Sequence, residues 1–337
     1  MVPALAVADA LRGDGWDVHF VGGERAERTL VPAAGYPLEA LSVEGLARDN
    51  PLKAARAALK AVGAFWRSFG LLRRLQPDVV VGGGGYVAGP VGAAAVLLRI
   101  PLVLTEADSH LGLTNRMLAP FAKRVCLAFP LAGRKPPRYL VTGRPVPEPF
   151  TDRAAARERF GLRDDETCVL VFGGSLGARS INHASAEAFR DAPFHVLHAA
   201  GTRDHAELVP IVDGARNYDL REYISPFGPA LAASDLVVAR AGGSIFEVCA
   251  HGRPAVLVPY PHATADHQTA NARWMADGGA AIVIPDGELT GERLAHEVGG
   301  LLHDRSRLAE MARASAELAR PHAAADVAAE VARAAGS

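Results

Sequence analysis

The sequence predicts an α/β protein made of two doubly wound domains, each with a parallel sheet. Short runs rich in β-branched residues alternate with helical stretches in both halves, and several of these runs end in glycines. Such runs are typical of parallel strands that helices cover on both faces. The length of 337 residues fits two domains at roughly 150 residues each. Residues 133–153 carry five prolines, which marks a linker. We therefore place the domains at residues 1–147 and 148–337, facing each other across a cleft.

The elements follow in a regular order. Pro3 suits the first turn of a helix that runs through Arg12 and ends at Gly13 and Gly15. Each later strand is followed by a loop or a helix start. The segments that contain these strands are 16–23, 79–90 and 101–108 in the first half, and 167–182, 194–201, 235–247, 254–261 and 280–286 in the second.

The first helix has no strand before it in this sequence. A helix that opens a doubly wound domain normally follows a strand and a phosphate-binding turn. Without that strand, its neighbours would expose unpaired backbone groups and the core would contain a gap. We therefore expect about 15 further residues upstream of Met1. An in-frame stop codon directly before Met1 would contradict this expectation.

Composition excludes several classes of protein. The chain has 36 basic and 37 acidic residues, so no excess charge favours nucleic acid. Cys126, Cys168 and Cys249 form no CxxC pair, which argues against a disulfide scaffold or zinc ribbon and fits a reducing cytosol. The longest apolar stretch, residues 91–104, is interrupted by Arg99 and Pro101 and is too short to span a bilayer. These features predict a soluble cytosolic protein.

The strongest binding signal is the glycine turn at residues 172–179. Gly173, Gly174 and Gly177 follow an apolar strand and precede a helix. Glycines allow close approach of a ligand, and a helix N-terminus offers free N–H groups to a phosphate. Ser175 can donate its hydroxyl to a phosphate oxygen. The alternative is a plain strand-to-helix turn. The turn lacks GxGxxG spacing and the Walker lysine, which disfavours a dehydrogenase or an ATPase.

Two further segments of the second half carry polar groups after a strand. In residues 240–247, Glu247 could accept hydrogen bonds from a ribose diol, or could only complement the helix dipole. In residues 259–271, Asp266, Gln268 and Asn271 suit sugar hydroxyls. His262 and His267 are five positions apart, so they do not share a helix face, and we expect no zinc there.

The first half has a glycine loop at residues 82–89. Four consecutive glycines allow another molecule to contact bare backbone, or serve only tight packing, and we expect a helix to follow at Pro90. Residues 105–110 end the next strand with polar side chains, which we expect to point into the same cleft.

Together these motifs resemble the bacterial MurG family over nearly the whole chain. The matching segments are GGYVAGP (84–90), HLGLTNR (110–116), GGSLGARSIN (173–182), RAGGS (240–244) and DHQTANA (266–272). The resemblance implies a GT-B glycosyltransferase that moves N-acetylglucosamine from UDP to the muramyl sugar of lipid I, giving lipid II for peptidoglycan. It implies UDP-GlcNAc and lipid I as partners and no cofactor.

The resemblance also implies roles for individual residues. Ser175, with Gly174, would meet a donor phosphate. Ile224 would hold the uracil through its backbone, and Gln268 would bind hydroxyls of the N-acetylglucosamine. Further implied contacts are Gly243 and Ser244 with the phosphate and sugar, Glu247 with the ribose, and Gly84 and Gly85 with the acceptor diphosphate.

The chain departs from the family pattern at several places. The first glycine loop of the family, which ends in a histidine proposed as base, would fall just before Val2. Within Thr105-Glu106-Ala107-Asp108, Glu106 alone matches the family. Arg144 stands where relatives carry an asparagine, near the position of a family arginine that Pro147 occupies here. The RAGGS turn is one residue shorter than usual, which could move Glu247.

The implied chemistry is a single inverting displacement by the acceptor 4-hydroxyl, with UDP as leaving group. A base must accept the proton, and the growing charge on the diphosphate must be stabilised. The helix N-terminus after Ser175 could do this without a metal, since no DxD pair ends a strand. The base is not identified: Asp108 and Glu106 are candidates beside the absent histidine.

Residues 50–77 suggest contact with a membrane. They contain six basic residues and no acidic residue. Aromatic residues recur beside these cations at near-helical spacing. Such a pattern suits the headgroups of an anionic bilayer, or a helix whose stripe packs on its own sheet. We expect peripheral attachment at the cytoplasmic face of the membrane. The residues concerned are Lys53, Arg56, Lys60, Arg67, Arg73, Arg74 and Leu52, Leu59, Val62, Phe65, Trp66, Phe69.

Other functions stay open from the sequence. Another GT-B enzyme, such as a UDP-sugar epimerase or a lipid glycosyltransferase, would share the donor turns. A UDP-sugar-binding remnant without activity would fit the altered residues 105–108.

Overall fold

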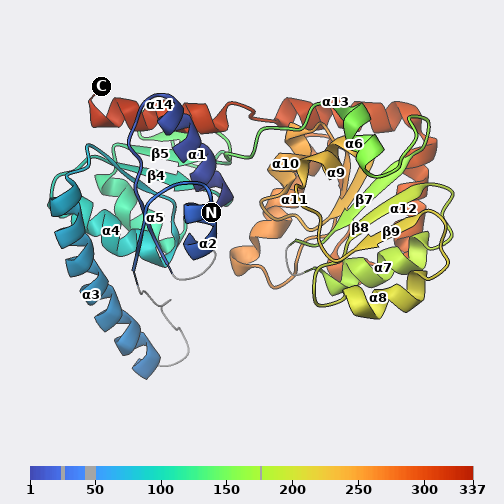
Figure 1. Ribbon diagram of the computed structural model, residues 1–337, viewed down its shortest axis with the longest axis horizontal. Helices are drawn as coiled ribbons and strands as arrows, with labels where there is room; N and C mark the ends of the chain where they lie inside the picture. Colours follow the sequence, from blue (N-terminus) through green and yellow to red (C-terminus); the bar gives the residue numbers. More distant parts are fainter. Residues whose placement is uncertain (24–26, 42–50, 175–176, 337) are drawn as a thin grey trace. The chain divides into compact units, whose positions relative to one another are not determined.

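The computed structural model describes residues 1–23, 27–41, 51–174 and 177–336, without the side chains of 51–59 and 264. It consists of two compact units (Figure 1). Unit 1 comprises Met1–Val146 and Arg320–Ser337, and unit 2 comprises Pro147–Ala319. This differs from the expected second domain, 148–337, because the last helix belongs to unit 1.

The last helix, α14 (Ala323–Ala335), joins unit 1 through its apolar side. Val327 and Val331 lie in one core cluster with Val7 and Leu11 of the first helix. Arg124 Nε also lies 2.9 Å from Glu330 Oε2. The position of α14 in the sequence does not tell which element will cover its apolar stripe. Burial of that stripe decides which unit the helix joins.

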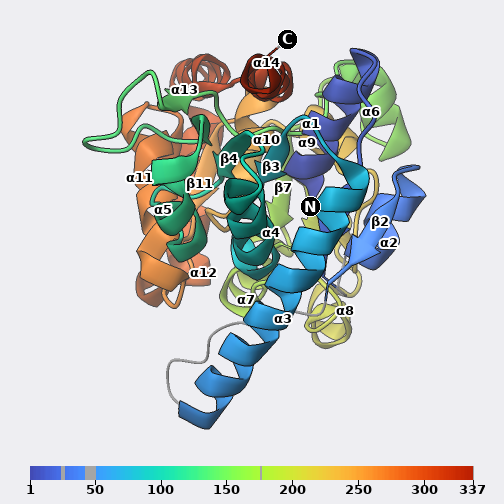
Figure 2. The same ribbon diagram turned by 90° about the vertical axis from the view of Figure 1, so that its left-hand side faces the viewer.

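The described strands of unit 1 are all parallel and form two sheets, β1-β2 and β3-β4-β5-β6. Figure 2 shows α3 extending along α4. The elements are α1 (Val2–Gly13), β1 (Phe20–Gly22), α2 (Glu27–Ala33), β2 (Leu38–Ala40), α3 (Pro51–Leu75), β3 (Val80–Gly82), α4 (Gly85–Leu97), β4 (Leu102–Glu106), α5 (Leu113–Leu118), the 3-10 helix η1 (Ala119–Phe121), β5 (Arg124–Leu127), β6 (Tyr139–Val141) and α14.

Two local features of unit 1 bear on the expectations. The first helix spans Val2–Gly13 and buries Val7, Ala8 and Leu11, which confirms a helix opened by Pro3. The expected helix start at Pro90 is wrong, because α4 begins at Gly85 and contains Pro90. Gly84 and Gly85 have φ of +78° and +75°, which lets the chain turn directly from the strand loop into the helix.

Unit 2 has one parallel sheet of six strands in the order β12-β11-β10-β7-β8-β9. The central strands β7 and β10 are buried along their whole length. The elements are α6 (Arg153–Arg159), β7 (Cys168–Phe172), α7 (Arg179–Phe189), β8 (His195–Ala199), α8 (His205–Val212), β9 (Tyr218–Arg221), α9 (Gly228–Ala233), β10 (Leu236–Ala239), α10 (Ile245–Ala250), β11 (Ala255–Leu257), η2 (Thr264–Asp266), α11 (His267–Asp277), β12 (Ala281–Val283), η3 (Asp286–Glu288), α12 (Gly291–His303) and α13 (Arg305–Leu318).

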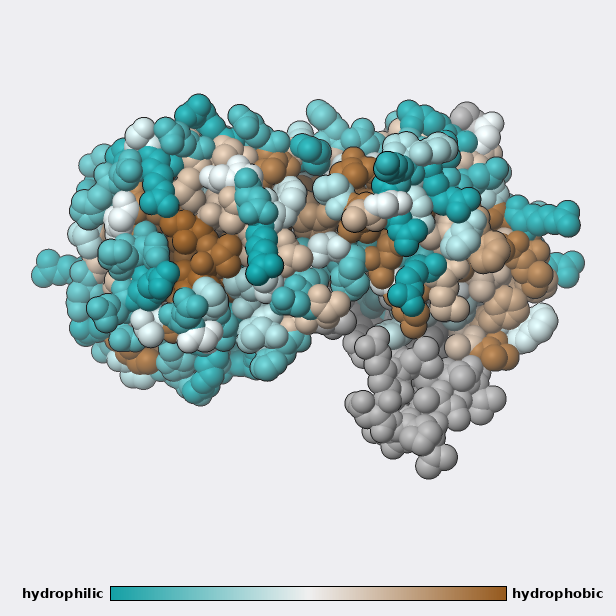
Figure 3. All heavy atoms as spheres, turned by 180° about the vertical axis from the view of Figure 1, so that it is seen from behind, coloured by the Kyte–Doolittle hydropathy of each residue, from teal (hydrophilic) through white to brown (hydrophobic). Residues whose placement is uncertain are grey.

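The surface mixes polar and apolar side chains. Figure 3 shows hydrophobic patches of modest size among hydrophilic residues. In the described part of the chain, no helix combines the length and the apolar character that crossing a bilayer requires.

Candidate functional site

The two glycine turns of unit 2 lie at neighbouring strand ends. Residues 173–178 follow β7 and residues 240–244 follow β10, and these two strands pair in register from Val169–Leu236 to Phe172–Ala239. Because the strands are parallel, both turns lie at the carboxyl edge of the sheet. They also lie where the strand order reverses, which is where open α/β sheets bind ligands.

The first turn requires its glycines. A Cβ on Gly177 would lie 2.1 Å from the carbonyl oxygen of Ala200, and Gly177 has φ of +78°. A Cβ on Gly173 would lie 2.3 Å from Ala178. Gly174 has φ of +98° but open space around it. Its role and that of Ser175 in binding phosphate stay predictions, and Ser175 lies outside the described residues.

A buried polar network holds this turn. Asn182, in the first turn of α7, donates from Nδ2 to the Ala200 carbonyl and to Asp204 Oδ2, both at 2.8 Å. Its Oδ1 accepts from His198 Nε2 at 3.0 Å, and Tyr218 donates its hydroxyl to His198 Nδ1 at 2.7 Å. Burial lowers the pKa of His198 to about 3. The imidazole therefore stays neutral, and each of its two nitrogens has one partner.

The second turn brings together three of the residues that are predicted to bind the UDP-sugar. Gly243 and Ser244 are partly exposed and precede α10, and Glu247 lies half-buried in the first turn of that helix. Gln268 Nε2 would lie 3.9 Å from a Cβ on Gly242, so Gln268 borders this turn. Gln268 Oε1 accepts from the Tyr260 amide at 3.0 Å, which leaves the side-chain amide group to donate.

Asn271 supports the turn from beneath. Its side chain is 2% exposed, and Nδ2 donates to the Ala241 carbonyl at 3.0 Å. The interpretation of Asn271 as a residue for sugar hydroxyls is therefore less favoured than an anchoring role. Asp266 accepts from the hydroxyl of Thr269 at 2.6 Å.

Ile224 follows β9, which lies two strands from β7 in the sheet. Its side chain is 4% exposed, and burial fixes the local backbone after the strand. Ile224 therefore lies at the carboxyl edge as well. Its contact with uracil stays a prediction.

Sequence reasoning missed a charged cluster beneath the two turns. Arg240 Nη1 lies 2.5 Å from Asp286 Oδ1, and Arg240 Nη2 donates to Ser180 Oγ at 2.8 Å. Ser180 in turn donates to Asp286 Oδ1 at 2.6 Å. The signal available in the sequence was an arginine directly after an apolar strand, separated from two glycines by Ala241 alone.

In unit 1, Glu106 is engaged within the protein. It is 7% exposed, and its carboxylate accepts from the amides of Asp108 and Gly112 and from Asn115 Nδ2, at 3.3, 2.8 and 2.9 Å. These bonds hold the loop after β4 and occupy both oxygens. The geometry therefore favours a structural role for Glu106 over a role as base, and Asp108 is the more exposed of the two candidates.

Three of the predicted unit 1 residues line one cavity. Gly84, Glu106 and Arg144 all border a space of about 520 Å³, which extends between β1 and β3. Gly85 and Asp108 are outside that lining. The roles of Gly84, Gly85, Arg144 and Asp108 in substrate binding stay predictions. The same holds for Glu106 and Asp108 as candidate bases.

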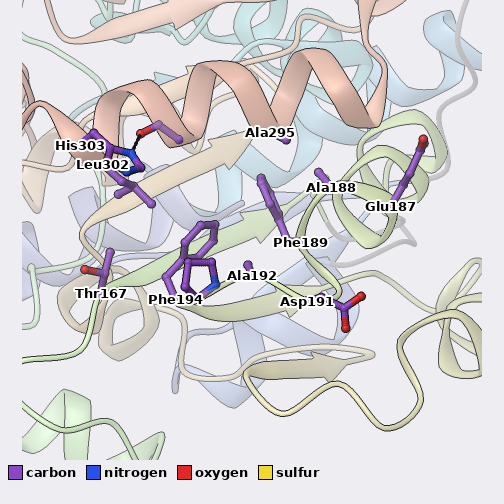
Figure 4. A pocket seen from close by; sticks show the side chains of 12 residues that line it. Thr167, Glu187, Ala188, Phe189, Asp191, Ala192, Phe194, Ala295, Leu302 and His303 are labelled. Atoms are coloured by element: carbon purple, nitrogen blue, oxygen red, sulfur yellow. Dashed lines mark hydrogen bonds between the residues drawn. The ribbon is translucent and has the colours of Figure 1, made fainter.

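Unit 2 contains another cavity, of about 500 Å³ (Figure 4). Phe189, Phe194 and Leu302 line it together with His303, whose Nδ1 bonds to the Gly299 carbonyl at 2.7 Å. Thr167 and Phe194 precede β7 and β8, so this cavity lies at the amino edge of the sheet. It is separate from the glycine turns.

Two parallel-sheet α/β units with glycine turns at the carboxyl ends of strands are the fold of GT-B glycosyltransferases. The glycosyltransferase family 28 N-terminal domain matches residues 1–127, and the glycosyltransferase family 28 C-terminal domain matches residues 168–328. The chain belongs to glycosyltransferase family 28 and, within it, to the MurG family.

Relatives and solved structures agree with this assignment. The chain is 42% identical to the UDP-N-acetylglucosamine–N-acetylmuramyl-(pentapeptide) pyrophosphoryl-undecaprenol N-acetylglucosamine transferase of Moorella thermoacetica, over 95% of this chain and 92% of that protein. It is 41% identical to the transferase of the same name from Desulforudis audaxviator, over 95% and 91%. The crystal structure of MurG from Acinetobacter baumannii superimposes with a TM-score of 0.79 at 31% identity, over 98% of this chain and 95% of that one.

Proposed function

We propose that this chain transfers N-acetylglucosamine from UDP-GlcNAc to the muramyl 4-hydroxyl of lipid I, with inversion, and so makes lipid II. The observation that carries this proposal is the 42% identity, over nearly the full length of both chains, to a transferase named for that reaction. A UDP-GlcNAc 2-epimerase from Neisseria meningitidis shares the fold at a TM-score of 0.69, but only 12% of the residues are identical.

In this proposal unit 2 binds the donor. The diphosphate contacts the turn after β7 and the first free amides of α7, which carry partial positive charge. Glu247 accepts hydrogen bonds from the ribose, and Gln268 donates to hydroxyls of the sugar. The growing charge on the leaving diphosphate is stabilised by amides that are already oriented by the Asn182 network.

Unit 1 binds the acceptor through the segment around Gly84 and Gly85 and through Arg144. The backbone of Gly84, at φ of +78°, has no side chain between it and a ligand. Asp108 is the candidate to accept the proton of the attacking hydroxyl in the described part of the chain.

The reaction is tested with the full chain, UDP-GlcNAc and a soluble lipid I analogue. We expect release of UDP only when both substrates are present, together with the disaccharide product. Gln268→Ala should raise the KM for UDP-GlcNAc roughly tenfold, which corresponds to the loss of one or two hydrogen bonds. Consumption of UDP-GlcNAc without acceptor would instead identify an epimerase, and UDP binding without turnover would identify a binding remnant.

We further propose that unit 1 attaches peripherally to the anionic cytoplasmic face of the membrane through α3. Val62 and Trp66 are 56% and 61% exposed, and Arg67, Arg73 and Arg74 are exposed on the same helix. Phe65 and Phe69 are only partly buried and pack against the core of unit 1. The expected patch is therefore narrower than the sequence suggested, since Phe65 and Phe69 are shared with the core. The side chains of Leu52, Lys53, Arg56 and Leu59 lie outside the described residues.

A further inference from the structure

Tyr260 is an exposed aromatic residue beside the second glycine turn. It follows β11, which pairs in parallel with β10, so Tyr260 and the turn at residues 240–244 lie at the same carboxyl edge of the sheet. The residue is 43% exposed, and the donor contacts proposed for unit 2 do not involve its side chain. A tyrosine offers a large apolar surface to a ligand at such an edge.

Arg240 fixes the position of the Tyr260 ring. Its Nη1 donates to the carbonyls of Val258 and Pro259, at 3.1 and 3.2 Å. Its Cζ lies over the Tyr260 ring, 5.5 Å from the centre. The His262 ring lies nearly perpendicular to that of Tyr260, with the ring centres 5.6 Å apart. Because these contacts already hold the ring, a ligand that binds to it loses little affinity to the ordering of a side chain.

Tyr260 also adjoins the side chain that is predicted to bind the sugar. The Tyr260 amide donates to Gln268 Oε1 at 3.0 Å. This bond leaves Gln268 Nε2 to donate to a ligand, on the side where a Cβ on Gly242 would lie 3.9 Å from it. A sugar that accepts a hydrogen bond from Nε2 therefore lies next to residue 260.

The backbone between Tyr260 and Gln268 has an unusual conformation. Ala265 and Asp266 have φ of +52° and +53°, in the left-handed region that disfavours residues other than glycine. Asp266 is held there by the Thr269 hydroxyl, which donates to its carboxylate at 2.6 Å. Strained residues of this kind cluster at ligand sites, where the surrounding contacts maintain them. The conformation of this segment thus agrees with a binding role for both of its ends.

We propose that Tyr260 is a specificity-determining residue whose ring stacks on the pyranose ring of the donor sugar. This inference rests on the proposed function, because it assigns a contact within the same UDP-sugar site. The hydroxyl and acetamido groups on the ring of N-acetylglucosamine are equatorial, so the faces of the sugar present C–H groups. Such a face packs on the electron-rich face of an aromatic ring. Gln268 binds the polar edge of the sugar, and Tyr260 contacts its apolar face.

The experiment compares UDP with UDP-GlcNAc, because the ratio of their Kd values isolates contacts to the sugar. Calorimetry measures both Kd values for the full chain and for Tyr260→Ala, Tyr260→Phe and Tyr260→Leu. We expect Tyr260→Ala to raise the Kd for UDP-GlcNAc roughly fivefold and the Kd for UDP by less than about twofold. With a lipid I analogue, the KM for UDP-GlcNAc should rise by the same factor while kcat stays within about twofold.

The other two variants are matched controls. Tyr260→Phe keeps the aromatic ring and should bind both ligands as the parent does. Tyr260→Leu keeps apolar bulk without a flat face and should resemble Tyr260→Ala. The bond to Gln268 is available in all three variants, because it uses the backbone amide of residue 260.

An unchanged ratio in Tyr260→Ala would overturn the proposal, as would full affinity for UDP-GlcNAc in Tyr260→Leu. Equal weakening of UDP and UDP-GlcNAc would also overturn it, since Tyr260 would then only support the turn through Arg240. The proposed function is judged separately by the parent chain. A parent that bound neither ligand would contradict both proposals, whereas normal binding by the parent and by Tyr260→Ala would contradict the stacking contact alone.

Discussion

Arg240 and Asp286 form a short ion pair in unit 2, with Nη1 and Oδ1 2.5 Å apart and side chains 11% and 22% exposed. Arg240 follows β10 and precedes the second glycine turn, whereas Asp286 follows β12. Ser180 of α7 bonds to both. The pair thus connects the start of the helix after the first turn with the start of the second turn, beneath the two glycine turns.

Removal of this carboxylate should weaken both folding and donor binding. Asp286→Ala leaves the Arg240 guanidinium partly buried without its carboxylate. We expect the free energy of unfolding to fall by about 3 kcal/mol and the Kd for UDP to rise roughly tenfold, measured by urea unfolding and calorimetry. Ser180→Ala keeps the ion pair and should cost about 1 kcal/mol. Unchanged UDP affinity in Asp286→Ala would exclude a positioning role.

The two glycines of the first turn should respond differently to alanine. Gly177→Ala places a methyl group 2.1 Å from the Ala200 carbonyl oxygen, which forces the turn apart. We expect UDP binding to weaken by at least about 100-fold, near 3 kcal/mol. Gly174→Ala has open space around it and meets only the backbone cost of positive φ, about 1 kcal/mol.

Calorimetry with UDP compares the two variants at a temperature where circular dichroism shows both folded. Similar losses of affinity in both would mean that steric crowding at Ala200 does not decide the shape of the turn.

The buried His198 should make unit 2 sensitive to acid. Its pKa is about 3 in the folded protein against an ordinary value of 6.5, so the unfolded chain binds the proton first. The contribution of neutral His198 to the free energy of unfolding is therefore complete above pH 6.5. Below that pH, the free energy of unfolding falls by about 1.4 kcal/mol per pH unit as the pH approaches 3. Urea unfolding of the parent and of His198→Gln between pH 7 and 4 measures it. Carboxylates contribute equally to the pH dependence of the parent and the variant. Parallel plots of the free energy of unfolding against pH would therefore contradict the assignment of this acid sensitivity to His198.

Membrane attachment should depend on the exposed apolar side chains of α3. A Val62→Ser/Trp66→Ser double variant loses apolar area that could enter a bilayer. We expect its flotation with vesicles of anionic phospholipid to fall by at least about tenfold, with Tm unchanged. The control is Val209→Ser, which removes a comparably exposed apolar residue of unit 2. Undiminished flotation of the double variant would place the attachment elsewhere.

Much of the fold follows from local pattern. Apolar runs such as residues 168–172 predict buried parallel strands because helices cover both faces of such a sheet. Glycines after these runs indicate the turns, and the motifs around Gly173 and Gln268 identify the family. The helix start at Gly85 was missed because proline is typical of the first turn of a helix, whereas here Pro90 lies within it.

The amino-acid sequence alone determined the two parallel-sheet domains, the glycine turns and the family, because strand and turn signals reside in neighbouring residues. Tertiary structure alone decided that α14 packs on α1 and that Arg240 forms an ion pair with Asp286. It also decided that both carboxylate oxygens of Glu106 accept hydrogen bonds from the segment that follows β4. These contacts join residues far apart in the chain or depend on how a loop folds back. Their formation depends on which surfaces are buried together, which no local pattern specifies.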